Sequence, residues 1–241
     1  MAEVNSTTTA DGAADPGLAT RLIGVVFSPR DAYSAVAARP RALGALTVTV
    51  LIMIAANAIF LSSEVGQNAL LDQQLSAMKA FGVTVTNEMV QQLEARLPYA
   101  VYSTAASLAV GVPLISAIIA GLLLAIFTAV LGGGATFKQV YAVVAHSTII
   151  GAMAQVFSMP IMYARGEMAS PSTLAVFFPM LEETSFFTYL FSAIDLFHLW
   201  SLINVSIGVA VLYKRSTGSV AAVLLGIYAV IVVIIAAVRA F

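Results

Sequence analysis

Five long apolar stretches, separated by more polar segments, constrain the fold more than any other feature of this sequence. Each stretch reaches the roughly 20 residues that an α-helix needs to cross a bilayer. Only 10% of the residues are charged, against about 25% in soluble domains, so most of the outer surface must face lipid. We therefore predict an all-α, polytopic transmembrane bundle. Its five spans cover residues 42–62, 98–131, 137–164, 186–213 and 220–238.

Short segments flank these spans. Residues 1–17 are small and polar, which predicts a disordered cytoplasmic tail in front of a five-span membrane domain at 18–241. Ser28 and Pro29 suit the start of an N-terminal amphipathic helix that carries Tyr33 on its apolar face. We expect this helix to lie on the cytoplasmic membrane surface.

Two regions of the sequence depart from the pattern of a single upright span. Between spans one and two, Gly82 ends one helical pattern and Thr86 begins another, which predicts a helical hairpin at the far membrane face. The stretch 98–131 is too long for one upright span and contains Pro113. It fits one long, tilted and kinked helix, and a short helix followed by a span is the alternative.

The distribution of basic residues predicts the orientation, because lysine and arginine collect in cytoplasmic loops. With the N-terminus in the cytoplasm, seven basic residues lie inside and four outside. The N-terminus is therefore expected inside and the C-terminus outside. The inner residues are Arg21, Arg30, Arg39, Arg41, Lys138, Lys214 and Arg215, and the outer ones are Lys79, Arg96, Arg165 and Arg239.

Several polar side chains fall within the predicted spans, where each is costly to bury and is therefore a candidate functional group. Asp195 and His198 lie one turn apart in span four. Counting the helical rise from the inner ends gives two expected layers. The outer layer would hold Asn57, Gln155 and Asp195, and the inner layer would hold His146 and Asn204.

The favoured interpretation of these groups is structural, because polar side chains often bridge helices in membrane bundles. A proton or solute path is the second interpretation. A metal site is the third, since Asp195 and His198 present two ligand types on one helix face. A metal would need a further ligand, and His146 lies at a different depth, so we predict no metal site.

The sequence lacks the active-site motifs of several common enzyme classes. The chain has no cysteine, no His-Glu-x-x-His pair and no Gly-x-Ser-x-Gly turn. The triple glycine at 132–134 lacks the Gly-Lys that follows it in a phosphate-binding loop. A net charge of −1 argues against nucleic acid. We therefore expect no enzyme activity, no catalytic residues and no cofactor.

Three segments, taken in order, resemble the Yip family of five-span membrane proteins, named for interaction with Ypt/Rab GTPases, and specifically its bacterial members. The first contains Phe27 and Pro29 ahead of span one. The second, GGATFKQV at 133–140, opens span three. The third, IDLFHLW at 194–200, lies in span four and is followed by Gly208. The family-motif positions are Phe27, Pro29, Gly133, Phe137, Lys138, Asp195, Phe197 and Trp200.

This resemblance implies a non-enzymatic bundle in a bacterial cytoplasmic membrane, with the N-terminus inside. Such a bundle would organise the membrane or act as a scaffold for membrane-protein partners, including copies of itself. Rab binding is not expected, because the long N-terminal domain and the Asp-Leu-Tyr-Gly-Pro motif of the eukaryotic branch are missing. Core packing is the expected role of Phe197 and Trp200. The alternative function is a small transporter or channel that uses Asp195, His198 and His146.

Overall fold

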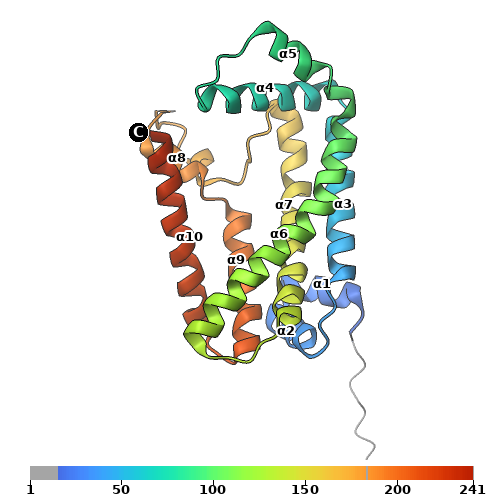
Figure 1. The fold of residues 1–241 in the computed structure, drawn as a ribbon, viewed down its shortest axis with the longest axis vertical. Coiled ribbons are helices and arrows are strands. Elements are labelled where there is room, and N and C mark those ends of the chain that lie inside the picture. The colour runs from blue at the N-terminus through green and yellow to red at the C-terminus, as the bar shows by residue number, and fades with distance from the viewer. Residues whose placement is uncertain (1–15, 183, 241) are drawn as a thin grey trace, which may run out of the picture.

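The computed structural model describes residues 16–182 and 184–240, and helices joined by loops make up this part of the chain (Figure 1). Five of the described helices are long and apolar enough to cross a membrane, which confirms the predicted fold class. Most of the tail predicted for residues 1–17 lies outside the described residues. The helices are α1 (Leu18–Phe27), α2 (Pro29–Ala38), α3 (Leu43–Leu61), α4 (Glu64–Ala80), α5 (Asn87–Glu94), α6 (Ala100–Leu131), α7 (Phe137–Arg165), α8 (Phe186–Ser192), α9 (Leu196–Tyr213) and α10 (Thr217–Ala240).

Helix α7 is the centre of the bundle. It packs against α3, α6 and α9, while α10 packs against α8 and α9. The short helices α1 and α2 lie at one end of the bundle, and α4 and α5 cover the other end (Figure 1). Side chains of α7 such as Val143 and Ile150 are fully buried, so the most enclosed span carries most of the core.

Local signals in the sequence explain several helix ends. Gly132 adopts a left-handed conformation, φ 63°, and ends α6, as glycine does readily because it has no Cβ. Thr136 then begins α7 with a reciprocal capping box to Gln139. Gly133 between them packs so closely on Tyr213 that a Cβ would overlap the ring. This glycine turn therefore also fixes where α6 and α7 meet α9.

The predicted helical hairpin between spans one and two is present as α4 and α5. Gly82, φ 74°, follows the end of α4. The Thr86 hydroxyl accepts a hydrogen bond from the Met89 backbone N–H and caps α5. Gly82 therefore follows the first helix of this hairpin and Thr86 begins the second, as predicted.

Residues 100–131 form one helix, α6, with Pro113 inside it. The alternative of a short helix followed by a separate span is therefore not what the chain adopts. Helix α6 runs obliquely across the bundle (Figure 1), which accommodates a helix of 32 residues, longer than an upright crossing requires.

The segment 186–213, predicted as one span, is instead broken into α8 and α9. Asp195 has an extended conformation, φ −106° and ψ 133°, and its side chain caps α9. It also forms an isolated antiparallel bridge with Thr173. Apolar residues on both sides of the break, Ile194 and Leu196, kept the hydropathy pattern continuous, and neither proline nor glycine marked the break.

The predicted N-terminal amphipathic helix is confirmed as α2 and is preceded by a second helix, α1. Its surroundings differ from those we expected at the membrane surface. Tyr33 and Val36 are fully buried because α2 packs against α7 and α9. The apolar face of this helix therefore faces protein, and only its polar face, including Arg30, is exposed.

Candidate functional site

The N-terminal hairpin, which we define as residues 18–38, is tightly folded on itself and on the bundle. A Cβ at Gly24 would lie 3.0 Å from the Ala32 Cβ, so glycine permits α1 and α2 to approach closely. Arg21 is only 4% exposed. Its guanidinium donates through Nε to the Pro16 carbonyl at 3.0 Å and through Nη1 to the Arg39 carbonyl at 3.3 Å. These bonds hold a cation inside the end of the bundle that carries the hairpin.

Tyr33 connects the hairpin to α7. Its hydroxyl lies 2.6 Å from Ser147 Oγ, and Ser147 donates in turn to the Val143 carbonyl at 3.0 Å, so Tyr33 is the donor of the first bond. Burial raises the pKa of Tyr33 well above its usual range, and the bond to Ser147 opposes this in part. The phenol therefore stays neutral and keeps its proton for the hydrogen bond.

Gly208 of α9 makes room for this contact. A Cβ at this position would overlap Val143 Cγ1 and lie 3.1 Å from Tyr33 Cδ1. The hairpin is also bonded to α7 at its other end, where Gln139 Nε2 donates to the Ala37 carbonyl at 3.2 Å. The residues at 33, 143, 147 and 208 thus form a single packed junction of three helices.

His146 is fully buried on α7, one residue before Ser147. Its Nδ1 lies 2.8 Å from the Ala142 carbonyl oxygen. Within the described residues its other ring nitrogen, Nε2, has no hydrogen-bond partner. Buried polar atoms are rarely left in this state, which makes His146 unusual among the polar groups of this bundle.

Asn204 is buried on α9 and connects it to the hairpin. The amide is satisfied when its nitrogen donates to the Val25 carbonyl at 2.8 Å and its oxygen accepts from Trp200 Nε1 at 3.0 Å. His146 and Asn204, the predicted inner layer, are both buried at interfaces of neighbouring helices. No hydrogen bond between them is recorded in the described part of the chain.

Asp195 accepts hydrogen bonds through both of its carboxylate oxygens. Its Oδ1 accepts from the backbone N–H groups of Phe197 at 2.8 Å and His198 at 3.2 Å. Its Oδ2 accepts from the hydroxyls of Ser170 at 2.7 Å and Ser172 at 2.5 Å. One carboxylate therefore caps α9 and anchors the loop that precedes α8.

The other predicted members of the outer layer make different contacts. Asn57 donates to the Met53 carbonyl of its own helix at 2.9 Å. Gln155 is half-buried on α7. In the described ranges, neither is hydrogen-bonded to Asp195. His198 Nδ1 lies 3.6 Å from Asp195 Oδ1, but its side chain is 76% exposed.

The family-motif positions fall into two groups. Phe27, Phe137 and Lys138 are exposed at the end of the bundle that holds the hairpin. Pro29 is the first residue of α2, and Gly133, as described above, lies in the turn against α9.

Phe197 and Trp200 form the second group, which is packed. Their rings lie 6.0 Å apart between centroids, and both pack against the core cluster that includes Tyr33 and Val143. This arrangement agrees with the core-packing role expected of large aromatic residues. In addition, Trp200 supplies a hydrogen bond to Asn204.

Sequence reasoning missed Ser170, Ser172 and Ser147, which bind Asp195 and Tyr33. Serine is common in loops and in membrane helices, so its type carried no signal. The short spacing of Ser170 and Ser172 was visible, but it lies 23 to 25 residues from Asp195. Residues this far apart in the sequence can be recognised as hydrogen-bond partners only in the folded structure.

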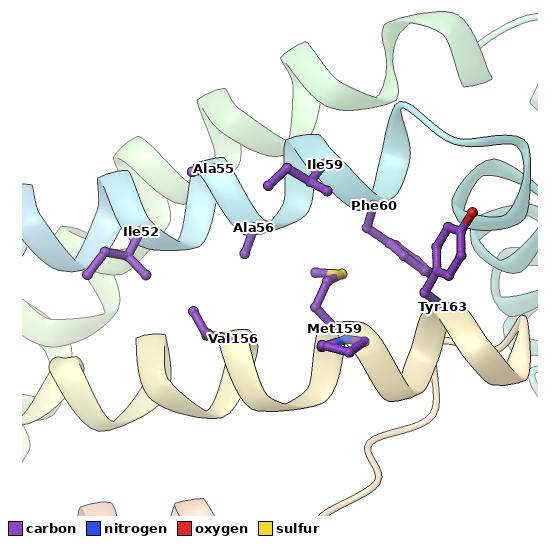
Figure 2. A pocket seen from close by; sticks show the side chains of 9 residues that line it. Ile52, Ala55, Ala56, Ile59, Phe60, Val156, Met159 and Tyr163 are labelled. Atoms are coloured by element: carbon purple, nitrogen blue, oxygen red, sulfur yellow. The ribbon is translucent and has the colours of Figure 1, made fainter.

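A groove of about 680 Å³ opens between α3 and α7, in the halves of both helices that lie away from the N-terminal hairpin (Figure 2). Its walls are almost wholly apolar. A second, smaller hollow of about 300 Å³ shares Ile52 and Val156 with it. The lining includes Ala55, Ala56, Ile59, Val156, Pro160 and Tyr163.

Comparison with known proteins identifies the family. A family model described as the Yip1 domain matches residues 23–238, nearly the whole chain. No curated protein matches the chain, and no solved structure does. The match confirms the resemblance drawn from the three motifs. This multi-pass, helical membrane protein belongs to the Yip1 domain family.

Proposed function

We propose that this protein is a non-enzymatic membrane scaffold that binds the transmembrane helix of a partner protein in the groove between α3 and α7. The groove is the observation that carries the proposal. Its open side faces outward between two apolar helices, and Ile59 on its rim is 76% exposed. Most of the polar side chains described inside the bundle form hydrogen bonds within the bundle itself.

The walls of the groove suit a helix. Ala55 and Ala56 are small enough to let a partner backbone approach closely, as small residues do in membrane helix pairs. Pro160 has no N–H, so the Val156 carbonyl one turn earlier lacks its normal helical donor. A serine or threonine hydroxyl on a partner helix would supply that hydrogen bond, whereas an acyl chain fills volume but donates nothing.

The proposed setting is a bacterial cytoplasmic membrane with the hairpin end inside. Lys138 lies in the first turn of α7, and Lys214 and Arg215 follow α9. These helix ends lie at the same end of the bundle as the hairpin (Figure 1). Clustering of basic residues at one end supports a cytoplasmic location for that end.

Photo-crosslinking in native membranes tests the scaffold proposal. A benzoylphenylalanine at Ile59, in the groove, is expected to give a discrete protein adduct. The same probe at Ile118, a 55% exposed position on α6 outside the groove, is the matched control and is expected to give none. Ala55→Phe, which fills the groove from an exposed position, should remove the adduct. Equal adducts from both probe positions, or adducts that survive Ala55→Phe, would contradict the proposal.

Flux measurements in liposomes address the alternative of a small transporter or channel. Because the oxygens of Asp195 are occupied by four local donors, we expect neither proton nor cation flux from the purified protein. Asp195→Asn should behave like the wild type in this assay. Flux that appears with the wild type and disappears in Asp195→Asn would replace the scaffold with a conduction path.

A further inference from the structure

We propose that α1 is a binding surface for anionic phospholipid, with its exposed apolar face in the membrane and Arg30 beside it at the headgroups. The inference does not depend on the groove between α3 and α7, nor on which side of the membrane the hairpin faces. It stands on the composition of the exposed face of α1, on the depth at which α1 lies, and on the charge of the segment around it.

The exposed face of α1 is uncharged and apolar. Ile23 and Phe27 lie one turn apart, and they are 60% and 80% exposed. Ala19, one turn before Ile23, is also exposed, so these three side chains form one stripe. The only charged residue of α1, Arg21, is buried. A helix that faced water would present charged side chains, whereas this stripe matches the apolar face of a helix that lies in the membrane interface.

Helix α1 lies at the depth where α3 enters the membrane. Leu18 packs on the start of α3, because a Cβ at Gly44 would lie 3.0 Å from Leu18 Cδ2. Helix α3 has 19 residues, which gives a length of about 28 Å, close to the thickness of the hydrocarbon core. Its first residue, Leu43, therefore lies near the edge of that core, and it is 80% exposed. Helix α1 runs across the spans at this level (Figure 1), so its stripe borders the lipid-facing surface of α3.

The segment around α1 is basic. Residues 18–42 contain four arginines and one acidic residue, Asp31. Phe27 ends α1, and Arg30, three residues later, is exposed in the first turn of α2. A phospholipid whose acyl chains contact Phe27 would therefore place its phosphate near the guanidinium of Arg30, and this pairing forms charge-assisted hydrogen bonds.

The same charge decides between the possible occupants of the stripe. A second copy of this chain docked on α1 would bring two sets of arginines together, which is unfavourable. An anionic lipid neutralises them instead. Each basic residue near an anionic membrane surface strengthens binding about fivefold.

The absence of cysteine from the chain permits a direct test. Phe27→Cys is labelled with nitrobenzoxadiazole, and the full-length protein is reconstituted in phosphatidylcholine liposomes. A low mole fraction of phospholipid with a nitroxide quencher on its acyl chain is added, either as phosphatidylglycerol or as phosphatidylcholine. We expect quenching by the phosphatidylglycerol to be about fivefold more effective. Ile23→Cys, on the same stripe, should show the same preference.

Two further label positions are matched controls. Ile118→Cys is 55% exposed on α6, a helix with no charged residue, and it should be quenched equally by both lipids. Ser34→Cys lies on the exposed face of α2 and should be quenched less than residue 27 by either lipid. Arg30→Gln should reduce the preference at residue 27, and Arg30→Lys should retain it.

Three results would overturn the proposal. The first is equal quenching by the two lipids at residues 23 and 27. The second is a preference for phosphatidylglycerol at residue 27 that Arg30→Gln leaves unchanged. The third is a label that neither lipid quenches at residue 27, because protein or water would then cover the stripe.

Discussion

Gly208→Ala is expected to destabilise the protein by about 3 kcal/mol, at the upper end of the range for overpacking a core. The added methyl group would overlap Val143 Cγ1 and press on the Tyr33 ring, and both side chains are fully buried. Val143 is β-branched and has little rotamer freedom on a helix, so it cannot move aside. Thermal unfolding in detergent, followed by gel filtration, should show a lower apparent melting temperature.

The matched control for this prediction is Gly226→Ala on α10, where a Cβ would meet no atom within 4 Å. That variant should be as stable as the wild type or slightly more so, because alanine favours helix over glycine. Adding Val143→Ala to Gly208→Ala should restore part of the loss, since it removes the overlapping methyl groups. If Gly208→Ala and Gly226→Ala melted at the same temperature, the close packing of the junction would be wrong.

Asp195→Ala is expected to be the second severe change, costing about 3 kcal/mol from the lost helix cap and the charge-assisted hydrogen bonds. Without the carboxylate, α9 loses its N-terminal acceptor, and the hydroxyls of Ser170 and Ser172 lose theirs. The pairing of this loop with the start of α9 should loosen. Hydrogen exchange should therefore accelerate at the Leu174 and Leu196 amides, which donate to the Ile194 and Ser172 carbonyls.

Asp195→Asn is the control, because an amide keeps an oxygen that can cap α9 and a nitrogen that can donate to the serine hydroxyls. We expect a loss of about 1 kcal/mol and exchange close to that of the wild type. A similar loss in the alanine and asparagine variants would show that the negative charge, rather than the set of acceptors, holds the loop.

Together these two positions explain how a bundle with few polar contacts keeps one arrangement. At one end of the bundle, the N-terminal hairpin is held through Tyr33, Asn204 and the space left by Gly208. In the broken span, the loop before α8 is held through Asp195. Both junctions join segments that are far apart in the sequence, and each stabilises a non-spanning element against the spans.

Much of the fold was predictable from local patterns. The number of spans followed from apolar runs long enough to cross a bilayer. The end of α4 and the start of α5 followed from Gly82 and Thr86, whose backbone preferences act within a few residues. The N-terminal amphipathic helix followed from the spacing of its apolar residues.

The candidate site was predictable only in part. Asp195, His146 and Asn204 stood out because ionisable and amide side chains are rare within apolar runs. Their partners did not stand out, because a serine or a backbone carbonyl shows no pattern of its own. The predicted outer layer stays a prediction, since no hydrogen bond among the described residues joins Asn57 or Gln155 to Asp195. The depth estimate behind it assumed a continuous span four, and that span is broken.

What the sequence by itself determined is therefore the number of spans, several helix ends and the family. Hydrophobic length, capping and turn residues act locally and can be read along the chain. Only the tertiary structure decided that the amphipathic helix packs against protein, that span four breaks at Asp195, and that α3 and α7 separate into a groove. These outcomes depend on contacts between side chains that are distant in sequence. The partner of a helix face or of a carboxylate is set by the tertiary fold and not by its neighbours along the chain.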